Sequence, residues 1–223
     1  MFSKELNKKL DQYHLLNHPF YRSWNDGKLT REIIKDYAEQ YYQHVKAFPR
    51  YISATHSICE DLEKRRILLE NLQDEENKDG DHPKLWKNFA KSLGADEKEI
   101  ENVKLDWFTK DMIDNFFSQA RKSYAEGLAS LYTYERQIPE IAETKIRGLK
   151  NHYGVNSKEG LEFFEVHKAA DVYHRQACEK LLDAMSKEEQ EKAEKSALST
   201  AKYLWNFLTG IAVKHNIPMQ AAA

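Results

Sequence analysis

The chain has 223 residues, of which 41% are hydrophobic and 31% are charged, and 34 basic against 36 acidic side chains leave a net charge of −2. This balance excludes a strongly basic nucleic-acid-binding domain, and two cysteines without a Cys-x-x-Cys pair exclude a disulfide scaffold. No apolar run suits a signal peptide or a membrane span. We therefore expect a single cytoplasmic domain over residues 1–223, with neither nucleic acid nor membrane as a partner.

The hydrophobic pattern is helical along nearly the whole chain. Only eight Gly and five Pro occur, and no alternating strand pattern is present, which predicts an all-α fold. Thr30, Asp96, Ser157 and Ser186 are expected to cap helices, and Pro49 is expected to bend a helix or to restart the chain into a new one. The expected helices span about 3–16, 30–48, 50–58, 62–77, 85–93, 111–138 as one long or broken helix, 140–153, 157–185 and 186–215.

One helical segment carries His167, Asp171 and His174 as a His-x3-Asp-x2-His run. Offsets of four and seven residues place these three side chains on one face of a helix. Apolar residues continue the same face on both sides of the run: Phe163, Phe164, Cys178, Leu181, Leu182 and Met185. Because buried polar groups must be paired, protonated or bound to a metal, this face is a candidate metal site.

Two other predicted helices place acids on apolar faces. Glu75 follows Leu68 by heptad spacing, and Glu135 follows Leu128 in the same way. His82 lies seven residues after Glu75, beyond a glycine-containing break, and can fold back toward it. A buried carboxylate needs a cation or a proton, so these residues extend the candidate site.

The resulting set of three carboxylates and three imidazoles suits two first-row metals, with iron or manganese favoured over zinc. Two metals need a bridging carboxylate, for which Glu135 is our choice, and Asp171 is a second bridge or a terminal ligand. The simpler interpretation of the His-Asp-His run is an ordinary helix with an Asp–His pair. A ferritin-like bundle would need Glu-x-x-His pairs, which this chain lacks.

The ligand pattern resembles that of the heme-oxygenase-like dimetal oxidases, and within them the self-sacrificing 4-aminobenzoate synthases of the CADD type. All six ligand positions match, and further similar segments span about residues 14 to 185. They are His18-Pro19-Phe20-Tyr21, Asp36-Tyr37-Ala38, Tyr41-Tyr42, Lys46-Ala47-Phe48-Pro49, Asp74-Glu75-Glu76-Asn77, Tyr134-Glu135, Gln137-Ile138-Pro139, Lys145-Ile146-Arg147-Gly148-Leu149 and Ala170-Asp171-Val172 with His174.

The resemblance implies a heme-oxygenase-like bundle of seven or more helices with an internal site for two metals, Fe/Fe or Fe/Mn. It implies O2 as oxidant, an external reductant and 4-aminobenzoate as product for folate biosynthesis. Tyr21 matches the tyrosine that is cleaved, Lys145 the lysine that donates the amino group, and Tyr37 a site tyrosine that relays electrons or protons. Dimers are common for this fold, so the resemblance allows a homodimer.

The sequence itself supports these roles unequally. Lys145 lies four residues after Ile141 and four before Leu149, on the buried face of its helix, where burial would lower the pKa of its amine. Tyr37 has the spacing of an ordinary core residue. Tyr21 falls in a predicted break between helices, so its role depends on the resemblance alone.

Three other interpretations are open. The chain is a dimetal oxygenase of the same superfamily acting on an external small molecule, or a metal-free relative of the thiaminase or pyrroloquinoline quinone synthase kind. The third is a non-enzymatic protein that binds partner helices. Cys178 could serve as a nucleophile in the thiaminase alternative, although a small buried hydrophobic residue is the better interpretation.

Overall fold

The computed structural model describes residues 1–77 and 81–219, except for the side chains of residues 169–174. Within these ranges the chain forms helices and no strand, which confirms the all-α prediction. The helices are α1 (Phe2–Leu10), the 3-10 turns η1 (Asp11–Tyr13) and η2 (Leu15–Asn17), α2 (Pro19–Asn25), α3 (Arg31–Ser57), α4 (Leu62–Glu75), α5 (His82–Ser92), α6 (Glu97–Asn102), α7 (Trp107–Ala120), α8 (Tyr124–Glu135), α9 (Ile138–Asn151), α10 (Lys158–Asp183) and α11 (Lys187–Lys214).

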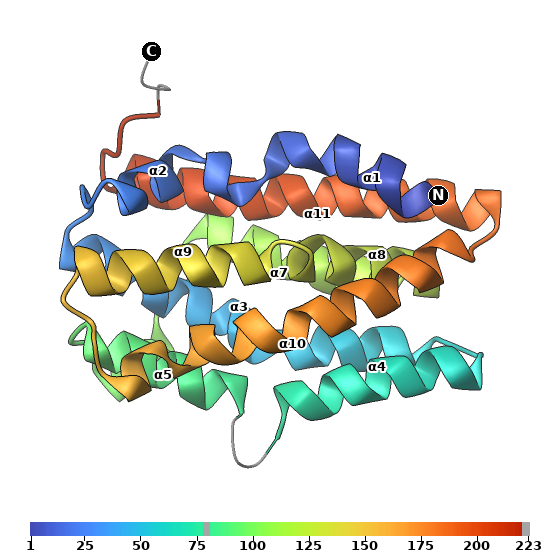
Figure 1. Ribbon diagram of the computed structural model, residues 1–223, viewed down its shortest axis with the longest axis horizontal. Helices are drawn as coiled ribbons and strands as arrows, with labels where there is room; N and C mark the ends of the chain where they lie inside the picture. Colours follow the sequence, from blue (N-terminus) through green and yellow to red (C-terminus); the bar gives the residue numbers. More distant parts are fainter. Residues whose placement is uncertain (78–80, 220–223) are drawn as a thin grey trace.

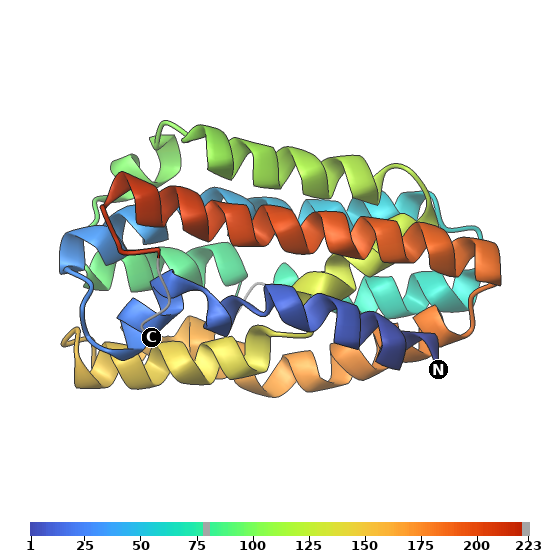
Figure 2. The same ribbon diagram turned by 90° about the horizontal axis from the view of Figure 1, so that it is seen from above.

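These helices form a bundle elongated along the axes of α3, α10 and α11 (Figure 1). The helix α11 packs along α8 and α7, α10 packs along α9 and α5, and α3 contacts α4, α5, α7 and α8. Seen from above, α9 and α10 lie along one side of the bundle and α7 along the opposite side (Figure 2). The helix α8 is buried from Gly127 to Glu135 because it is enclosed by its neighbours. Glu135 therefore lies at the end of an interior helix.

The predicted capping residues begin their helices as expected. Thr30 accepts a hydrogen bond from the Ile33 N–H at the start of α3, and Ser157 accepts one from Gly160 at the start of α10. Asp96 and Ser186 each take part in a full capping box, α6 and α11 following them.

The first part of the chain differs from the prediction. The first helix ends at Leu10 and not at Leu16, and the segment that follows forms two 3-10 turns. The break predicted at His18 and Pro19 is instead the start of α2, because the His18 ring accepts the Phe20 N–H and Pro19 takes the first helical position. This unpredicted short helix carries Tyr21.

Of two helix breaks that the sequence allowed, the structure lacks one and has the other. The helix α3 continues through Pro49, so the alternative of a restarted helix was wrong. Pro49 costs α3 the backbone hydrogen bond to the Val45 carbonyl, and the packing of both halves against neighbouring helices offsets this loss. The segment predicted as one long or broken helix over 111–138 is broken, since α7 ends at Ala120 and Ser123 caps α8.

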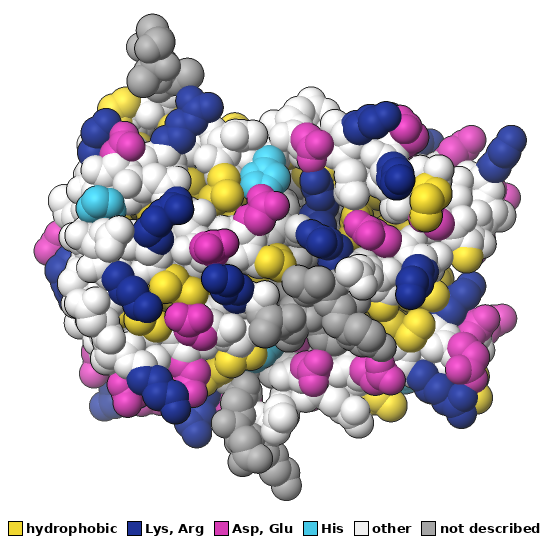
Figure 3. Space-filling view, in the orientation of Figure 1, with side chains coloured by type: hydrophobic (Ala, Val, Ile, Leu, Met, Phe, Trp, Pro, Cys, Tyr) yellow, Lys and Arg dark blue, Asp and Glu magenta, His cyan; other side chains and the backbone are white. Residues whose placement is uncertain are grey.

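The surface carries both signs of charge. On the face seen in Figure 3, basic and acidic side chains are interspersed over α9, α10 and α4. In the described ranges, no helix combines the length and the apolar character that crossing a membrane requires.

Candidate active site

Three of the predicted metal ligands converge in the interior. Glu75 ends α4, His82 begins α5, and His167 lies in the middle of α10. One potential ligand atom from each lies within 4.8 Å of those of the other two, and all three side chains are buried. The His82 Nδ1 atom lies 2.7 Å from the Glu75 carboxylate. The chain therefore folds back after α4 as the sequence predicted.

The orientation of His167 is fixed by its own helix. Its Nδ1 lies 2.6 Å from the Phe163 carbonyl oxygen, one turn earlier in α10. A carbonyl oxygen can only accept, so Nδ1 carries the proton and Nε2 keeps the lone pair that a metal requires. The ring also packs against the His82 ring, with centroids 4.2 Å apart.

Glu135 is held beside this group from the interior end of α8. The Asn71 side-chain amide donates to one carboxyl oxygen at 2.6 Å, and the Cys178 thiol lies 3.8 Å from the other. Burial, together with the nearby charge of Glu75, raises the pKa of Glu135 to about 7. Burial also raises the pKa of Cys178 well above its usual range, so this cysteine is a protonated thiol and a poor nucleophile.

The structure thus describes the side chains of four of the six predicted ligands. Glu75, His82 and His167 are brought together, and Glu135 lies close enough for the Glu75 charge to act on it. Asp171 and His174 follow His167 in α10, but their side chains lie outside the described residues. A buried group of carboxylate oxygen and imidazole nitrogen fits a first-row metal ion. The bridging role predicted for Glu135 stays a prediction.

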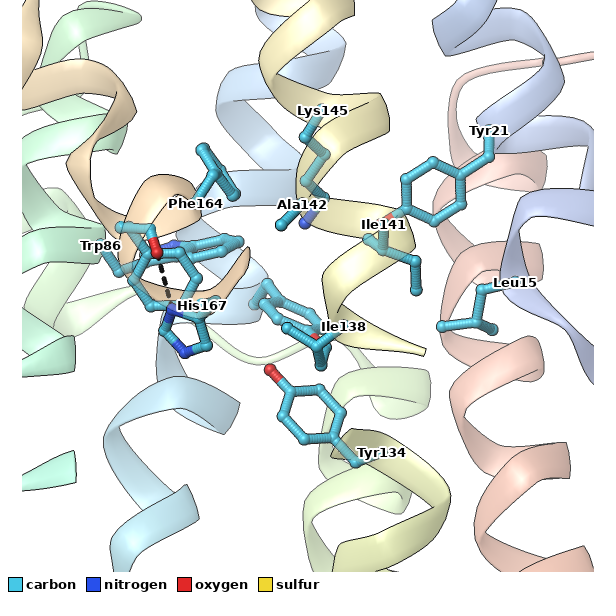
Figure 4. Close-up of a pocket in the computed structure, with 12 residues that line it drawn as sticks. Leu15, Tyr21, Trp86, Tyr134, Ile138, Ile141, Ala142, Lys145, Phe164 and His167 are labelled. Carbon is cyan, nitrogen blue, oxygen red and sulfur yellow. Dashed lines mark hydrogen bonds between the residues drawn. The ribbon is translucent and has the colours of Figure 1, made fainter. Parts of the chain in front are cut away.

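A small cavity of about 20 Å³ adjoins this group (Figure 4). Such a volume holds roughly one water-sized molecule. His167 and Phe163 belong to its wall and connect it to the candidate metal ligands. The full lining is Leu15, Tyr21, Tyr41, Trp86, Tyr134, Ile138, Ile141, Ala142, Lys145, Phe163, Phe164 and His167.

Lys145 is the buried cation of this cavity, and its side chain is 4% exposed. Among the side chains that the structure describes, no carboxylate forms an ion pair with it. Burial therefore lowers the pKa of its amine to about 7. Aromatic rings surround its Nζ atom, at distances of 4.9 to 5.9 Å from the centroids of Tyr21, Tyr37, Tyr41, Trp86 and Phe164.

A chain of polar contacts joins this lysine to the two predicted tyrosines. The Lys145 amine donates to the Tyr37 hydroxyl at 2.7 Å, and the Tyr37 hydroxyl in turn interacts with that of Tyr21. Figure 4 shows Tyr21 reaching from α2 toward Lys145 on α9. Burial raises the pKa of both phenols well above the usual range, so both are protonated.

The close approach of α2 to α9 depends on a glycine. Gly148 lies one turn after Lys145 on the same face of α9, and a Cβ atom there would collide with the Trp24 indole. Trp24 lies one turn after Tyr21 in α2. A small residue at position 148 therefore allows the two predicted reactive side chains to meet.

Sequence reasoning missed three residues of this site: Asn71, Tyr41 and Tyr134. Asn71 lies four residues before Glu75 in α4, and Tyr41 four residues after Tyr37 in α3, so helical spacing alone could have found both. Tyr134 directly precedes Glu135 and lines the same cavity as Tyr41. No periodicity indicates that two consecutive residues of an enclosed helix both reach a site.

Comparison with known proteins shows the family of the chain. Residues 3–213 match the model of the TENA/THI-4/PQQC family. The chain belongs to this family. It is 40% identical over 206 residues to a protein of Chlamydia pneumoniae named 4-aminobenzoate synthase, with 92% of each chain covered.

A second protein of that name, from Nitrosomonas europaea, is 37% identical over 222 residues, which cover 94% of this chain and 90% of the relative. The predicted resemblance to 4-aminobenzoate synthases is confirmed. The fold agrees with a solved domain of heme-oxygenase-like fold from Shewanella denitrificans, with a TM-score of 0.81 at 15% identity, covering 99% of this chain and 96% of that one. The predicted heme-oxygenase-like architecture is confirmed as well.

Proposed function

We propose that this chain is a dimetal oxidoreductase that forms 4-aminobenzoate for folate biosynthesis from its own Tyr21 side chain, with Lys145 as the amino donor. The relatives named 4-aminobenzoate synthase support the product. The observation that carries the internal substrate is the placement of a buried amine within 5.9 Å of the Tyr21 ring centroid, beside potential metal ligands.

The chemistry of the product fits these two side chains. The ring and Cβ of a tyrosine together contain all the carbon atoms of 4-aminobenzoate, with Cβ in the place of the carboxyl carbon. The nitrogen must come from elsewhere, and it must replace the phenolic oxygen. Lys145 is suited to supply it, because an amine with a pKa of about 7 is largely neutral at slightly alkaline pH and has a free electron pair.

The six predicted ligands divide into those that are brought together and those still to be tested. Glu75, His82 and His167 would hold one metal, and we propose that Glu135, Asp171 and His174 complete a site for two, Fe/Fe or Fe/Mn. The metals would activate O2, with electrons from an external reductant. Tyr37 lies between Lys145 and Tyr21, where its hydroxyl can hold or pass a proton.

The size of the cavity separates this proposal from its closest alternative, a dimetal oxygenase acting on an external molecule. A volume of about 20 Å³ accommodates a molecule the size of O2 or water, but an aromatic or amino-acid substrate would require the walls to rearrange. The aromatic ring that the product needs is already present as Tyr21.

The test is release of 4-aminobenzoate from reduced, metal-loaded protein exposed to O2 without added substrate. We expect no more than one product molecule per chain, and none from Tyr21→Phe. Tyr51→Phe is the matched control, since it removes a buried hydroxyl that has no hydrogen-bond partner among the described residues. Product from Tyr21→Phe, or many turnovers on an added substrate, would favour the external-substrate oxygenase.

A further inference from the structure

The Tyr21 side chain fills a buried, largely apolar space. It is 2% exposed, and its ring packs against Phe20 and Trp24, with centroids 5.5 and 6.4 Å away. Its ring also forms part of the wall of the cavity of about 20 Å³, opposite aliphatic side chains of α9. Removing this side chain would join its volume to that cavity. The combined space approaches the roughly 150 Å³ of an engineered apolar cavity that binds benzene.

This space has one polar end. The Tyr37 hydroxyl receives a hydrogen bond from Lys145 at 2.7 Å, which leaves its own proton to turn toward the Tyr21 hydroxyl, with which it interacts. Once the Tyr21 ring is gone, this proton faces the opened space without an acceptor, and an unsatisfied buried donor is costly. A ligand that restored this contact would need an aromatic ring with a hydroxyl at the Tyr37 end.

We propose that the space of the Tyr21 side chain is a binding site for a neutral para-substituted phenol, opened when that side chain is removed. The ligand of this class that fits most directly is p-cresol, which is the tyrosine side chain terminated at Cβ. In the native protein the opening depends on the proposed function, because loss of the Tyr21 ring is what would create the space. The chain left after the reaction would then bind phenols.

Because one end of the space is apolar, we expect the site to prefer neutral ligands over carboxylates. The same preference would favour release of the product. The Cβ end of the ligand would lie at α2, where the Tyr21 side chain begins and where Phe20 and Trp24 pack against its ring. A carboxylate placed there would lose its hydration without a partner. Benzoates such as 4-hydroxybenzoate should therefore bind more weakly than p-cresol, and a product that acquires a carboxylate at this position should leave.

The binding test uses the Tyr21→Gly chain, which lacks Cβ and so leaves the whole volume of p-cresol free, kept anaerobic, with Kd for p-cresol and for toluene measured by titration calorimetry. Wild-type protein should bind neither, because its own ring fills the space. The matched control is Tyr21→Gly combined with Tyr37→Phe, which removes the hydrogen-bond donor and changes the volume little. The ratio of the toluene Kd to the p-cresol Kd should fall about tenfold from the single to the double variant, and this comparison cancels differences in ligand hydration.

Two results would overturn the inference: no binding of p-cresol to a folded Tyr21→Gly protein, which would mean that the space collapses, or an unchanged ratio in the double variant. Tyr21→Ala, which keeps Cβ, serves with phenol and benzene as the ligand pair if Tyr21→Gly is insoluble. Because binding needs neither O2 nor turnover, its outcome is independent of whether the metal-loaded wild-type chain releases 4-aminobenzoate.

Discussion

Ionisable side chains are buried at both ends of the central cavity, but their surroundings differ. At one end Glu75, His82 and His167 gather donor atoms that can share a cation, and Glu135 lies beside them. At the other end the Lys145 amine lies among aromatic rings. Burial raises the pKa of Glu135 and lowers that of Lys145, each to about 7. The acidic end is thus prepared to bind a metal, whereas the amine end is prepared to hold a neutral nucleophile.

The largest expected effect comes from removing a predicted metal ligand at the acidic end of the cavity. His82→Gln should lose bound metal and all 4-aminobenzoate formation, because it removes one of three converging ligands. The metal content of purified protein, measured by mass spectrometry of the elements, checks this. Glu76→Gln is the control, since it changes an exposed carboxylate next to Glu75 and should bind metal normally. Equal metal content in the two variants would remove His82 from the site.

Removing the Lys145 amine should abolish formation of 4-aminobenzoate without loss of bound metal. Lys145→Met keeps an unbranched side chain of similar length and removes the nitrogen. In the unaltered protein, product formation in a single turnover should rise with pH through about 7 and then level off, because the amine must be neutral. Lys150→Met, at an exposed position of the same helix, should behave as the parent. Product from Lys145→Met would exclude this lysine as the donor.

The same lysine predicts a pH dependence of stability. Its pKa is about 7 in the folded chain and near 10.5 when unfolded, so between these values the unfolded state binds more protons. The free energy of unfolding should therefore gain a component that rises with pH from about 7 to 10.5. Lys145→Met should lack this component, and denaturant titrations across that pH range measure it.

A smaller effect is expected from the contact that orients Glu135. Asn71→Leu removes the amide that donates to its carboxyl at 2.6 Å and keeps a similar volume. Residues that orient a ligand in this way change metal affinity by about 10- to 100-fold. Titration of the metal-free variant with Mn²⁺ and with Fe²⁺ under anaerobic conditions gives this change, and an unaltered affinity would count against Glu135 as a ligand.

The smallest effect concerns the helix that carries Tyr21. His18 caps α2 through Nδ1, which accepts the Phe20 N–H at 3.0 Å, and its Nε2 lies 3.0 Å from the Thr209 hydroxyl. Burial lowers its pKa to about 4, so it stays neutral near pH 7. His18→Ala should cost about 1 kcal/mol of stability, and His18→Asn, which can still cap, should cost less. Equal losses in urea titrations would show that the cap contributes little.

Much of the fold followed from local signals. Capping residues and helical periodicity placed the starts of α3, α10 and α11, since these depend on neighbours within one turn. The helix α2 and the continuity of α3 through Pro49 were not predicted, because each depends on packing against distant segments. Gly148, for example, matters only because Trp24 packs on it.

The candidate site, like the fold, was predicted in part. Polar side chains on apolar helix faces identified Glu75 and His167, because burial of such groups demands a partner, and the spacing across a glycine-containing break identified His82. Tyr21 was found through resemblance alone, since it lies in a segment where periodicity gave no signal. Asn71 and Tyr134 were not predicted as site residues, because amides and tyrosines on a buried face are common in ordinary cores.

The central claim is that the ring of the product comes from Tyr21. The most direct measurement uses protein made with ring-¹³C-labelled tyrosine, reduced, loaded with metal and exposed to unlabelled buffer and O2. We predict that the released 4-aminobenzoate carries the labelled ring and that the peptide containing residue 21 loses the mass of the side chain in proportion. Unlabelled product, or an intact Tyr21 in protein that has released product, would contradict it.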